Sequence, residues 1–454
     1  MEINNTIAEQ WKGRELWRLL IPLIVEQILT VAIGLADTIM VASVGEYAVS
    51  GVSLVDSINM LLVIAFGALA TGGSVVVSQY IGRRNTKKAR VAARQLMYTT
   101  AVMSLAIMIF TVALCVPILR LVYGRIEADV MEAAKTYFML SAVSYPFLAI
   151  YNATASLYRS VGNSRISMLI SLLVNILNIT GNAILIFGFH LGVLGAGLAT
   201  MASRAAAAFV LTAMLLTDKY SPISLAGLFS IRLNGGVIRS ILKVGVPSGV
   251  ESSMFQIGKV LVSRIFTTFG TTAIAANAIS GSINSFTIMP GTAVGIGMMT
   301  IVGQCVGAKD FDSTRRYTKR LMRIAHCMAL VMSVTIILLM NPLLNVFNLS
   351  DEAKKIAQAL LWTSCVMTPL SWPLSFTLPN ALRAAGDARF VMIVAAISMW
   401  AVRVSAAYLF AYPLGMGPSG VWIAMTADWC ARGAFYAWRW RRGRWQNKNA
   451  LIEG

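Results

Sequence analysis

The chain has 454 residues, of which 57% are hydrophobic and 13% charged, and its mean hydropathy is +0.71. Soluble domains carry about a quarter charged residues, so this composition excludes an ordinary water-soluble globule and indicates an integral membrane protein. A net charge of +19 in a soluble protein would suggest nucleic-acid binding, but in a membrane protein it reflects which loops carry Lys and Arg, and we expect no nucleic-acid partner.

Twelve segments are long and apolar enough to span a bilayer, which takes about 20 residues in a helix. Their centres lie near residues 30, 63, 107, 147, 177, 205, 255, 288, 335, 370, 401 and 430. An even number of spans puts both termini on one side, and that side holds most of the 38 Lys and Arg residues. The sequence therefore predicts a multi-pass protein of the cell inner (cytoplasmic) membrane with both termini in the cytoplasm.

The two halves of the chain repeat one another. Six residues recur 225 positions later: Pro22, Glu26, Gly45, Ala48, Gln79 and Gly82 as Pro247, Glu251, Gly270, Ala273, Gln304 and Gly307. Three more recur 224 positions later: Arg159, Gly162 and Arg165 as Arg383, Gly386 and Arg389. The repeat predicts an all-α fold of two six-helix bundles related by a pseudo-two-fold axis along the membrane normal. We expect bundles over 1–216 and 241–454, joined by a cytoplasmic linker over 217–240.

One carboxylate in the first span is a candidate coupling residue. Charged groups inside a span cost about 3 kcal/mol each in lipid, so they face the protein interior. Asp37 has no basic residue within one helical turn, and the fifth span offers Asn175, Asn178 and Asn182 on one stripe, which Thr200 could join. Such oxygens suit a hard cation such as Na+, and a buried carboxylate could instead exchange a proton. A static polar network is the third alternative.

We therefore predict a Na+ or H+ coupling site at Asp37, Asn178, Asn182 and Thr200, with the first three as candidate Na+ ligands. The second half lacks these groups. Val262 replaces the carboxylate, and Val402 and Ala406 replace the two amides. Only the first half should bind the coupling ion.

The second half instead carries basic residues within its spans. Lys259, Arg264 and Arg403 accompany Glu251; they favour either an anionic substrate or ion pairing, for example between Arg403 and Glu251. Asp428 and Arg432, four residues apart on a helix, should pair with each other. We expect the following residues to line the substrate cavity: Glu26, Glu251, Gln256, Lys259, Arg403 and, in the proline-rich tenth span, Trp372.

The chain contains no P-loop, H-E-x-x-H or G-x-S-x-G motif. We therefore expect a secondary transporter and not an enzyme, with no cofactor other than the coupling ion. Its partners should be a small organic substrate and the lipid bilayer, and we expect a monomer.

Several stretches resemble the multidrug and toxic compound extrusion (MATE) family along the whole chain. They are IPLIVEQILTVAIGLADTIMVASVGEYAVSGVSL, QYIGRRN, SLYRSVGNSRISMLISLLVNILNITGNAILIFG and LGVLGAGLAT. The resemblance implies export of organic compounds driven by inward Na+ or H+ flow, with Asp37 as the coupling carboxylate and Asn178, Asn182 and Thr200 completing the site. Many members carry Asp where this chain has Asn182, and the acidic residues that some members use in helices seven and ten are not matched here.

The segments VPSGVESSMFQIGKVL and SMWAVRVSAAYLFAYPLGMGPSGVWIAMTADWCARGAF are similar to a branch of that family that includes a flavin-nucleotide exporter. We expect a cation-coupled antiporter that exports amphipathic organic compounds or drugs by alternating access. Two alternatives are an exporter of anionic metabolites such as flavin nucleotides and a lipid-linked oligosaccharide flippase.

Overall fold

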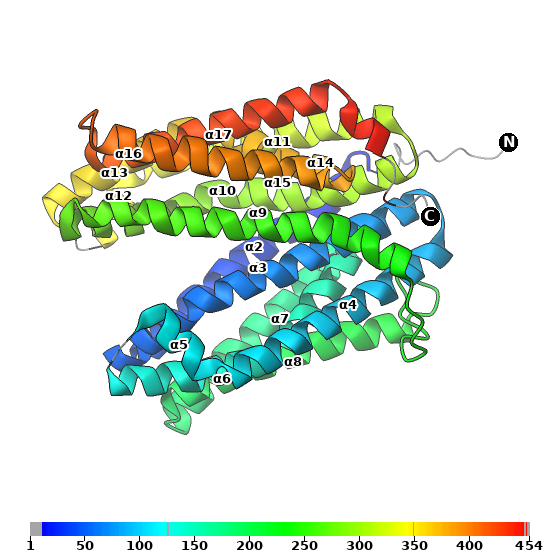
Figure 1. The fold of residues 1–454 in the computed structure, drawn as a ribbon, viewed down its shortest axis with the longest axis horizontal. Helices are drawn as coiled ribbons and strands as arrows, with labels where there is room; N and C mark the ends of the chain where they lie inside the picture. Colours follow the sequence, from blue (N-terminus) through cyan, green and yellow to red (C-terminus); the bar gives the residue numbers. More distant parts are fainter. Residues whose placement is uncertain (1–10, 125–126, 348, 449–450, 452–454) are drawn as a thin grey trace. The chain divides into compact units, whose positions relative to one another are not determined.

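The computed structural model describes residues 11–124, 127–347, 349–448 and 451. All regular structure in these residues is helical, and twelve long helical segments occupy the twelve positions expected from hydropathy (Figure 1). Eight of them are long and apolar enough to cross a membrane by length and composition alone. The other four are more polar; α9 (Gly235–Thr267), for example, carries Glu251, Lys259 and Arg264.

The first half forms a compact unit, Gly13–Gly249, which we call the amino-half unit. It contains α2 (Arg14–Ala42), α3 (Glu46–Gly82), α4 (Thr86–Ala113), α5 (Cys115–Tyr123), α6 (Ala128–Ser160), α7 (Ser164–Asn182), the π-helical stretch η1 (Ala183–Gly188) and α8 (Gly192–Thr217). Helix α6 packs against α3, α4 and α8, and α7 packs against α2 and α8. A core cluster around Phe66, Tyr145 and Leu148 joins α3 to α6.

The second compact unit, Val250–Gly454 together with Trp11 and Lys12, is the carboxyl-half unit. Beyond α9 it contains α10 (Gly270–Gly307), α11 (Phe311–Leu338), α12 (Met340–Val346), α13 (Asp351–Trp372), η2 (Pro373–Thr377), α14 (Leu378–Ala384), α15 (Ala388–Ile397), η3 (Ser398–Val404), α16 (Ser405–Ala411), α17 (Gly417–Arg441) and the 3-10 turn η4 (Arg444–Lys448). Helix α10 packs against α11, α13 and α14, while α17 packs against α13, α16 and the π-helical stretches η2 and η3.

Helix α9 crosses the boundary between the two units, which falls between Gly249 and Val250. Its first half packs closely on α3, because a Cβ added at Gly72 would lie 2.4 Å from the carbonyl oxygen of Ile241. Pro247 lies inside the helix, just before the boundary.

Residues 218–234 connect α8 to α9, so the last part of the expected linker 217–240 is already helical. This connection is held against α4 by side chains of that helix. Gln95 Nε2 donates to the carbonyl of Arg232 (2.7 Å), and the hydroxyl of Tyr98 donates to the carbonyl of Leu228 (2.5 Å).

The internal repeat also appears in the backbone conformation of the connections. Arg84 and Lys309, 225 positions apart, both adopt positive φ, at 56° and 60°. Each is followed by a helix cap in which a side-chain oxygen, of Asn85 or of Asp310, accepts from a backbone N–H three residues later. The same chain reversal is therefore built twice by matching local chemistry.

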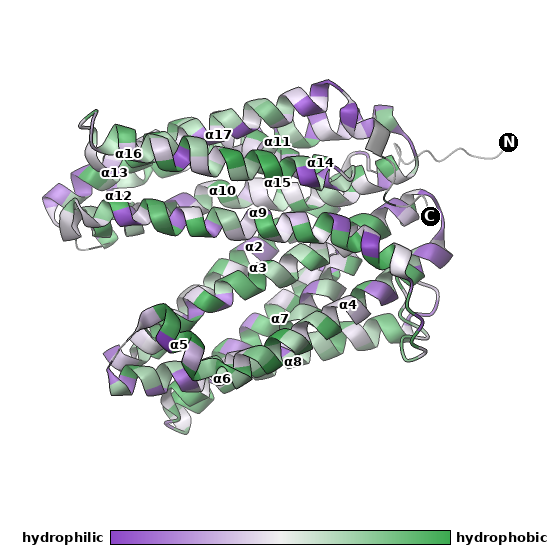
Figure 2. Ribbon diagram, in the orientation of Figure 1, coloured by the Kyte–Doolittle hydropathy of each residue, from purple (hydrophilic) through white to green (hydrophobic). Residues whose placement is uncertain are grey.

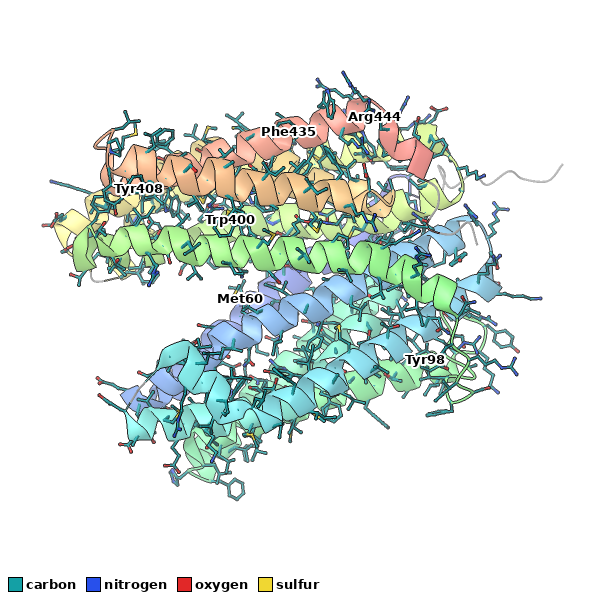
Figure 3. The ribbon with its side chains drawn as sticks, in the orientation of Figure 1. Met60, Tyr98, Trp400, Tyr408, Phe435 and Arg444 are labelled. Carbon is teal, nitrogen blue, oxygen red and sulfur yellow. The ribbon has the colours of Figure 1, made fainter. Side chains whose placement is uncertain are left out.

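Large apolar side chains are exposed along the helices, and Figure 2 shows hydrophobic residues over long stretches of both units. Phe435 is 56% exposed and Tyr408 is 62% exposed, and Figure 3 shows both with Trp400, which is 41% exposed. A soluble monomer rarely exposes so much apolar surface. In a membrane protein these side chains face the lipid acyl chains.

Candidate functional site

Three helices of the amino-half unit bring together the four residues predicted to form a coupling site, here called the amino-half cluster: Asp37 (α2), Asn178 and Asn182 (α7) and Thr200 (α8). Asn182 Nδ2 donates to Asp37 Oδ1 at 2.6 Å and lies 3.3 Å from Asn178 Oδ1. Asn178 Nδ2 in turn donates to Thr200 Oγ1 at 3.2 Å. One turn of helix separates the two asparagines, so both amides project toward the same neighbours.

The amino-half cluster contains an unsatisfied acceptor. Asn182 is fully buried, and because its amide N–H groups point at Asp37 and Asn178, its Oδ1 atom is left without a hydrogen-bond partner. Within the described ranges, Asp37 forms no ion pair closer than 4.0 Å. A buried carbonyl oxygen without a donor is costly, and it can be satisfied by a cation or by a protonated carboxyl group.

A second polar network adjoins this cluster. Asn59 Nδ2 donates to Ser141 Oγ (3.2 Å), and the Tyr145 hydroxyl donates to Asn59 Oδ1 (2.7 Å). Arg204 donates to Ser144 Oγ (2.8 Å) and is close enough to Asp37 to interact with it electrostatically.

Asn59, Ser141, Ser144 and Tyr145 were not predicted from the sequence, because uncharged polar groups in a span are common. The signal that could have found them is their helical spacing. Ser141, Ser144 and Tyr145 lie on one stripe of α6, opposite Asp56 and Asn59 on one stripe of α3.

Two predicted cavity residues are instead held in buried ion pairs. Glu26 accepts from Arg159 Nη1 (2.8 Å) and from the Ser167 hydroxyl (2.9 Å) in the amino-half unit. Glu251 accepts from Arg383 Nη2 through both carboxylate oxygens, each at 2.7 Å, in the carboxyl-half unit.

The pairing of Arg403 with Glu251, given above as one example of ion pairing, is not observed: Glu251 pairs with Arg383 at the end of α14, and Arg403 lies near Asp428. The two observed pairs are repeats of each other: the glutamates are 225 positions apart and the arginines 224.

The carboxyl-half unit contains an open cavity of about 750 Å³. Three of the residues predicted from the sequence line it: Lys259, Arg403 and Trp372. Gln256 and Glu251 are not among its lining residues. Six of its lining residues are aromatic: Phe255, Phe266, Phe376, Trp422 and Trp429 in addition to Trp372.

Arg403 belongs to the π-helical stretch η3 and is only 5% exposed. Its guanidinium lies over the ring of Phe255, with 5.2 Å to the ring centroid, and its Nη1 atom is 3.9 Å from Asp428 Oδ2. The predicted pair of Asp428 and Arg432 is confirmed, at 2.8 Å, and Ser398 also donates to Asp428 at 2.6 Å. Asp428 is therefore bound more closely by Arg432 than by Arg403.

The family model MatE matches this chain twice, over residues 22–184 and over residues 247–409. The two matches are displaced by the same 225 positions as the internal repeat. An uncharacterized transporter, YisQ of Bacillus subtilis, is 29% identical over 96% of this chain and 96% of its own length. A probable multidrug resistance protein, NorM of Thermotoga maritima, is 25% identical over 96% of this chain and 94% of its own.

Among solved structures, a crystal structure of MATE in the bent conformation superimposes with a TM-score of 0.89 at 20% identity, covering 98% of this chain and 99% of that one. At that identity the match establishes the fold: an all-helical membrane protein of the MATE type.

Proposed function

Because the chain belongs to the MatE family of membrane transporters, we propose that it is an antiporter that exports amphipathic organic compounds or drugs by alternating access. Na+ or H+ entering the cell drives export by binding at the amino-half cluster. The observation that carries this proposal is the buried Asn182 Oδ1 atom, which lacks a donor beside the carboxylate of Asp37. The name of the NorM relative supports the drug-like substrate class.

The amino-half cluster suits a monovalent cation. It offers one carboxylate and several neutral oxygens, the ligand types that hard cations take in proteins. Either ion fits the chemistry: Na+ would coordinate the Asp37 carboxylate and the Asn182 carbonyl, and a proton on Asp37 would turn that carboxylate into a donor for the same carbonyl after the amide rotates. In both cases the ion replaces the hydrogen bond between Asn182 and Asp37.

Ion binding can drive export only if the two transport states hold the ion with different affinity. Asp37, Asn182 and Thr200 come from three different helices, α2, α7 and α8, so an ion held by all of them favours one packing of these helices. Substrate release is then coupled to ion binding through the equilibrium between packings.

The test is efflux from proteoliposomes with a Na+ gradient and a H+ gradient imposed separately. Ethidium, norfloxacin and fluorescein provide cationic, zwitterionic and anionic test substrates. We expect one gradient to drive export and Asp37→Asn to abolish the driven component, while Asp312→Asn, at an exposed carboxylate in α11, leaves it unchanged. Undiminished gradient-driven efflux by Asp37→Asn would contradict the coupling role.

The family match favours an exporter over the lipid-linked oligosaccharide flippase considered from the sequence. Neither relative described above is named as a flavin exporter, so flavin nucleotides remain one candidate within the broader class of organic substrates. The excess of Lys and Arg in alternate connections supports cytoplasmic termini.

A further inference from the structure

The cavity of the carboxyl-half unit has a positive lining. Lys259 and Arg403 contribute two cationic side chains, and its described lining residues include neither Asp nor Glu. The carboxylate nearest to Arg403 is Asp428, which is fully buried and already bound by Arg432 and Ser398. Arg432 therefore balances the charge of Asp428, and the charge of Arg403 is left without a full counter-ion.

Three buried donors on this lining have no acceptor. Arg403 Nε, Arg403 Nη1 and Trp429 Nε1 are shielded from solvent, and none of them makes a hydrogen bond within the described part of the chain. Unsatisfied buried donors are rare in native proteins and call for an explanation. Arg403 and Trp429 both line the cavity, so a side-chain movement on ligand binding would let acceptor oxygens of the ligand satisfy these donors.

The amides on the lining also offer donors. Asn277 Oδ1 accepts from Trp422 Nε1 at 3.0 Å, and Asn284 Oδ1 accepts from the Ser364 hydroxyl at 2.5 Å. Since each carbonyl oxygen is engaged, the amide N–H group is what either residue can offer a ligand.

The walls of the cavity are suited to a planar ring system. Trp372 and Phe376 are stacked, with ring centroids 5.0 Å apart and an interplanar angle of 19°. Trp429 and Phe255 each meet the edge or face of Phe376 at near right angles. A volume of about 750 Å³ lies in the range of pockets that hold drug-sized molecules, and it is far larger than an inorganic anion requires.

We propose that this cavity binds aromatic organic anions, with Arg403 and Lys259 binding the anionic group and the stacked Trp372 and Phe376 contacting the rings. The inference rests on the proposed export function and names its substrate class. Arg403 is the main specificity determinant, because it combines a charge with two unsatisfied donors. Lys259 is more exposed than Arg403 and adds a second positive charge on a flexible side chain.

The test compares two ions that share one ring system, naphthalene-2-sulfonate and 2-naphthyltrimethylammonium. Calorimetric titration of the full chain in lipid nanodiscs, corrected with empty nanodiscs, measures the affinity for each. We expect the sulfonate to bind at least tenfold more tightly than the ammonium ion. Arg403→Gln should weaken sulfonate binding at least tenfold, because a charge-assisted hydrogen bond is lost, and Arg403→Lys should preserve the preference for the anion.

Arg264→Gln is the matched control, because Arg264 is an exposed basic residue of α9 that does not line the cavity. Lys259→Gln gives a second measurement if Arg403→Gln does not fold, and it should reduce the anion preference several-fold. Equal affinity for the two ions, or sulfonate binding unchanged in both Arg403→Gln and Lys259→Gln, would overturn the proposal.

Binding needs no gradient, so this test separates the two proposals. Selective sulfonate binding without ion-driven export in proteoliposomes would support the site and contradict the antiport function. Gradient-driven export of ethidium by a protein that shows no preference for the sulfonate would support the antiport function and contradict the proposed anion site.

Discussion

The ion pair between Glu251 and Arg383 allows a quantitative prediction about stability. Their side chains are only 12% and 14% exposed, and Arg383 Nη2 lies 2.7 Å from both carboxylate oxygens. Removing one member of a buried pair leaves a charge without compensation and typically costs about 3–5 kcal/mol. Since a little solvent access remains, we take the lower end, about 3 kcal/mol.

A loss of this size should be visible in thermal unfolding. For a unit of about 200 residues, 1 kcal/mol shifts Tm by about 2–4 °C, so Arg383→Gln should lower Tm by about 6–12 °C. Glu251→Gln should do the same. The double variant, which removes both charges, should recover most of the loss because no unpaired charge is left. Intrinsic tryptophan fluorescence during heating in detergent follows the transition.

The control is the exposed pair of Arg18 and Glu15, whose side chains are 45% and 49% exposed. Arg18→Gln should leave Tm unchanged, because solvent screens such pairs. The reasoning is refuted if Arg383→Gln behaves like Arg18→Gln, or if the losses from the two single variants simply add in the double variant. Arg159→Gln removes the ion-pair partner of Glu26 in the amino-half unit and should lower Tm by a similar amount.

Three further predictions address the packing, the coupling site and the topology. Gly72→Ala should destabilise the protein by about 1–3 kcal/mol through overpacking, whereas Gly67→Ala in the same helix meets nothing within 4 Å and should be neutral in the same melting assay. Asn182→Leu should lower the affinity for the coupling ion about tenfold, because leucine has no carbonyl oxygen to replace the free Asn182 Oδ1 atom as a partner of the ion, measured as the ion concentration for half-maximal efflux; an unchanged value would argue against a ligand role. In a cysteine-free variant, Tyr220→Cys should react with an impermeant maleimide only from the cytoplasm and Lys355→Cys only from outside. The opposite labelling would contradict the predicted topology.

The fold was predictable because its determinants are local or repeated. Stretches of about 20 apolar residues set the positions of the helices, and the 225-residue repeat required the second half to resemble the first. The grouping of Asn178 with Asn182 followed from helical spacing, and the contact of Asn182 with Asp37 from the cost of leaving a charge in lipid.

Partners far apart in the chain were not predictable in the same way. Glu26 and Arg159 are 133 residues apart, and Arg159 and Arg383 lie near the ends of their helices, where a basic residue is typical of a loop facing the cytoplasm. A signal for this ion pair did exist in the sequence, since both of its members recur in the second half.

The helical periodicity of α9 could have shown which of its residues line the cavity. Its cavity-lining residues Phe255, Lys259, Val262 and Phe266 form one helical stripe, which excludes the neighbouring Gln256.

Helix α9 has a mechanical consequence. It is a continuous helix of 33 residues with residues in each of the two units, so a change in the orientation of one unit relative to the other would bend or twist this helix. Pro247 has no N–H group to donate to the carbonyl four residues earlier. The helix should therefore bend most easily at this position, close to the boundary between the two units. Stiffening that single position with alanine would test whether turnover depends on how easily the helix flexes.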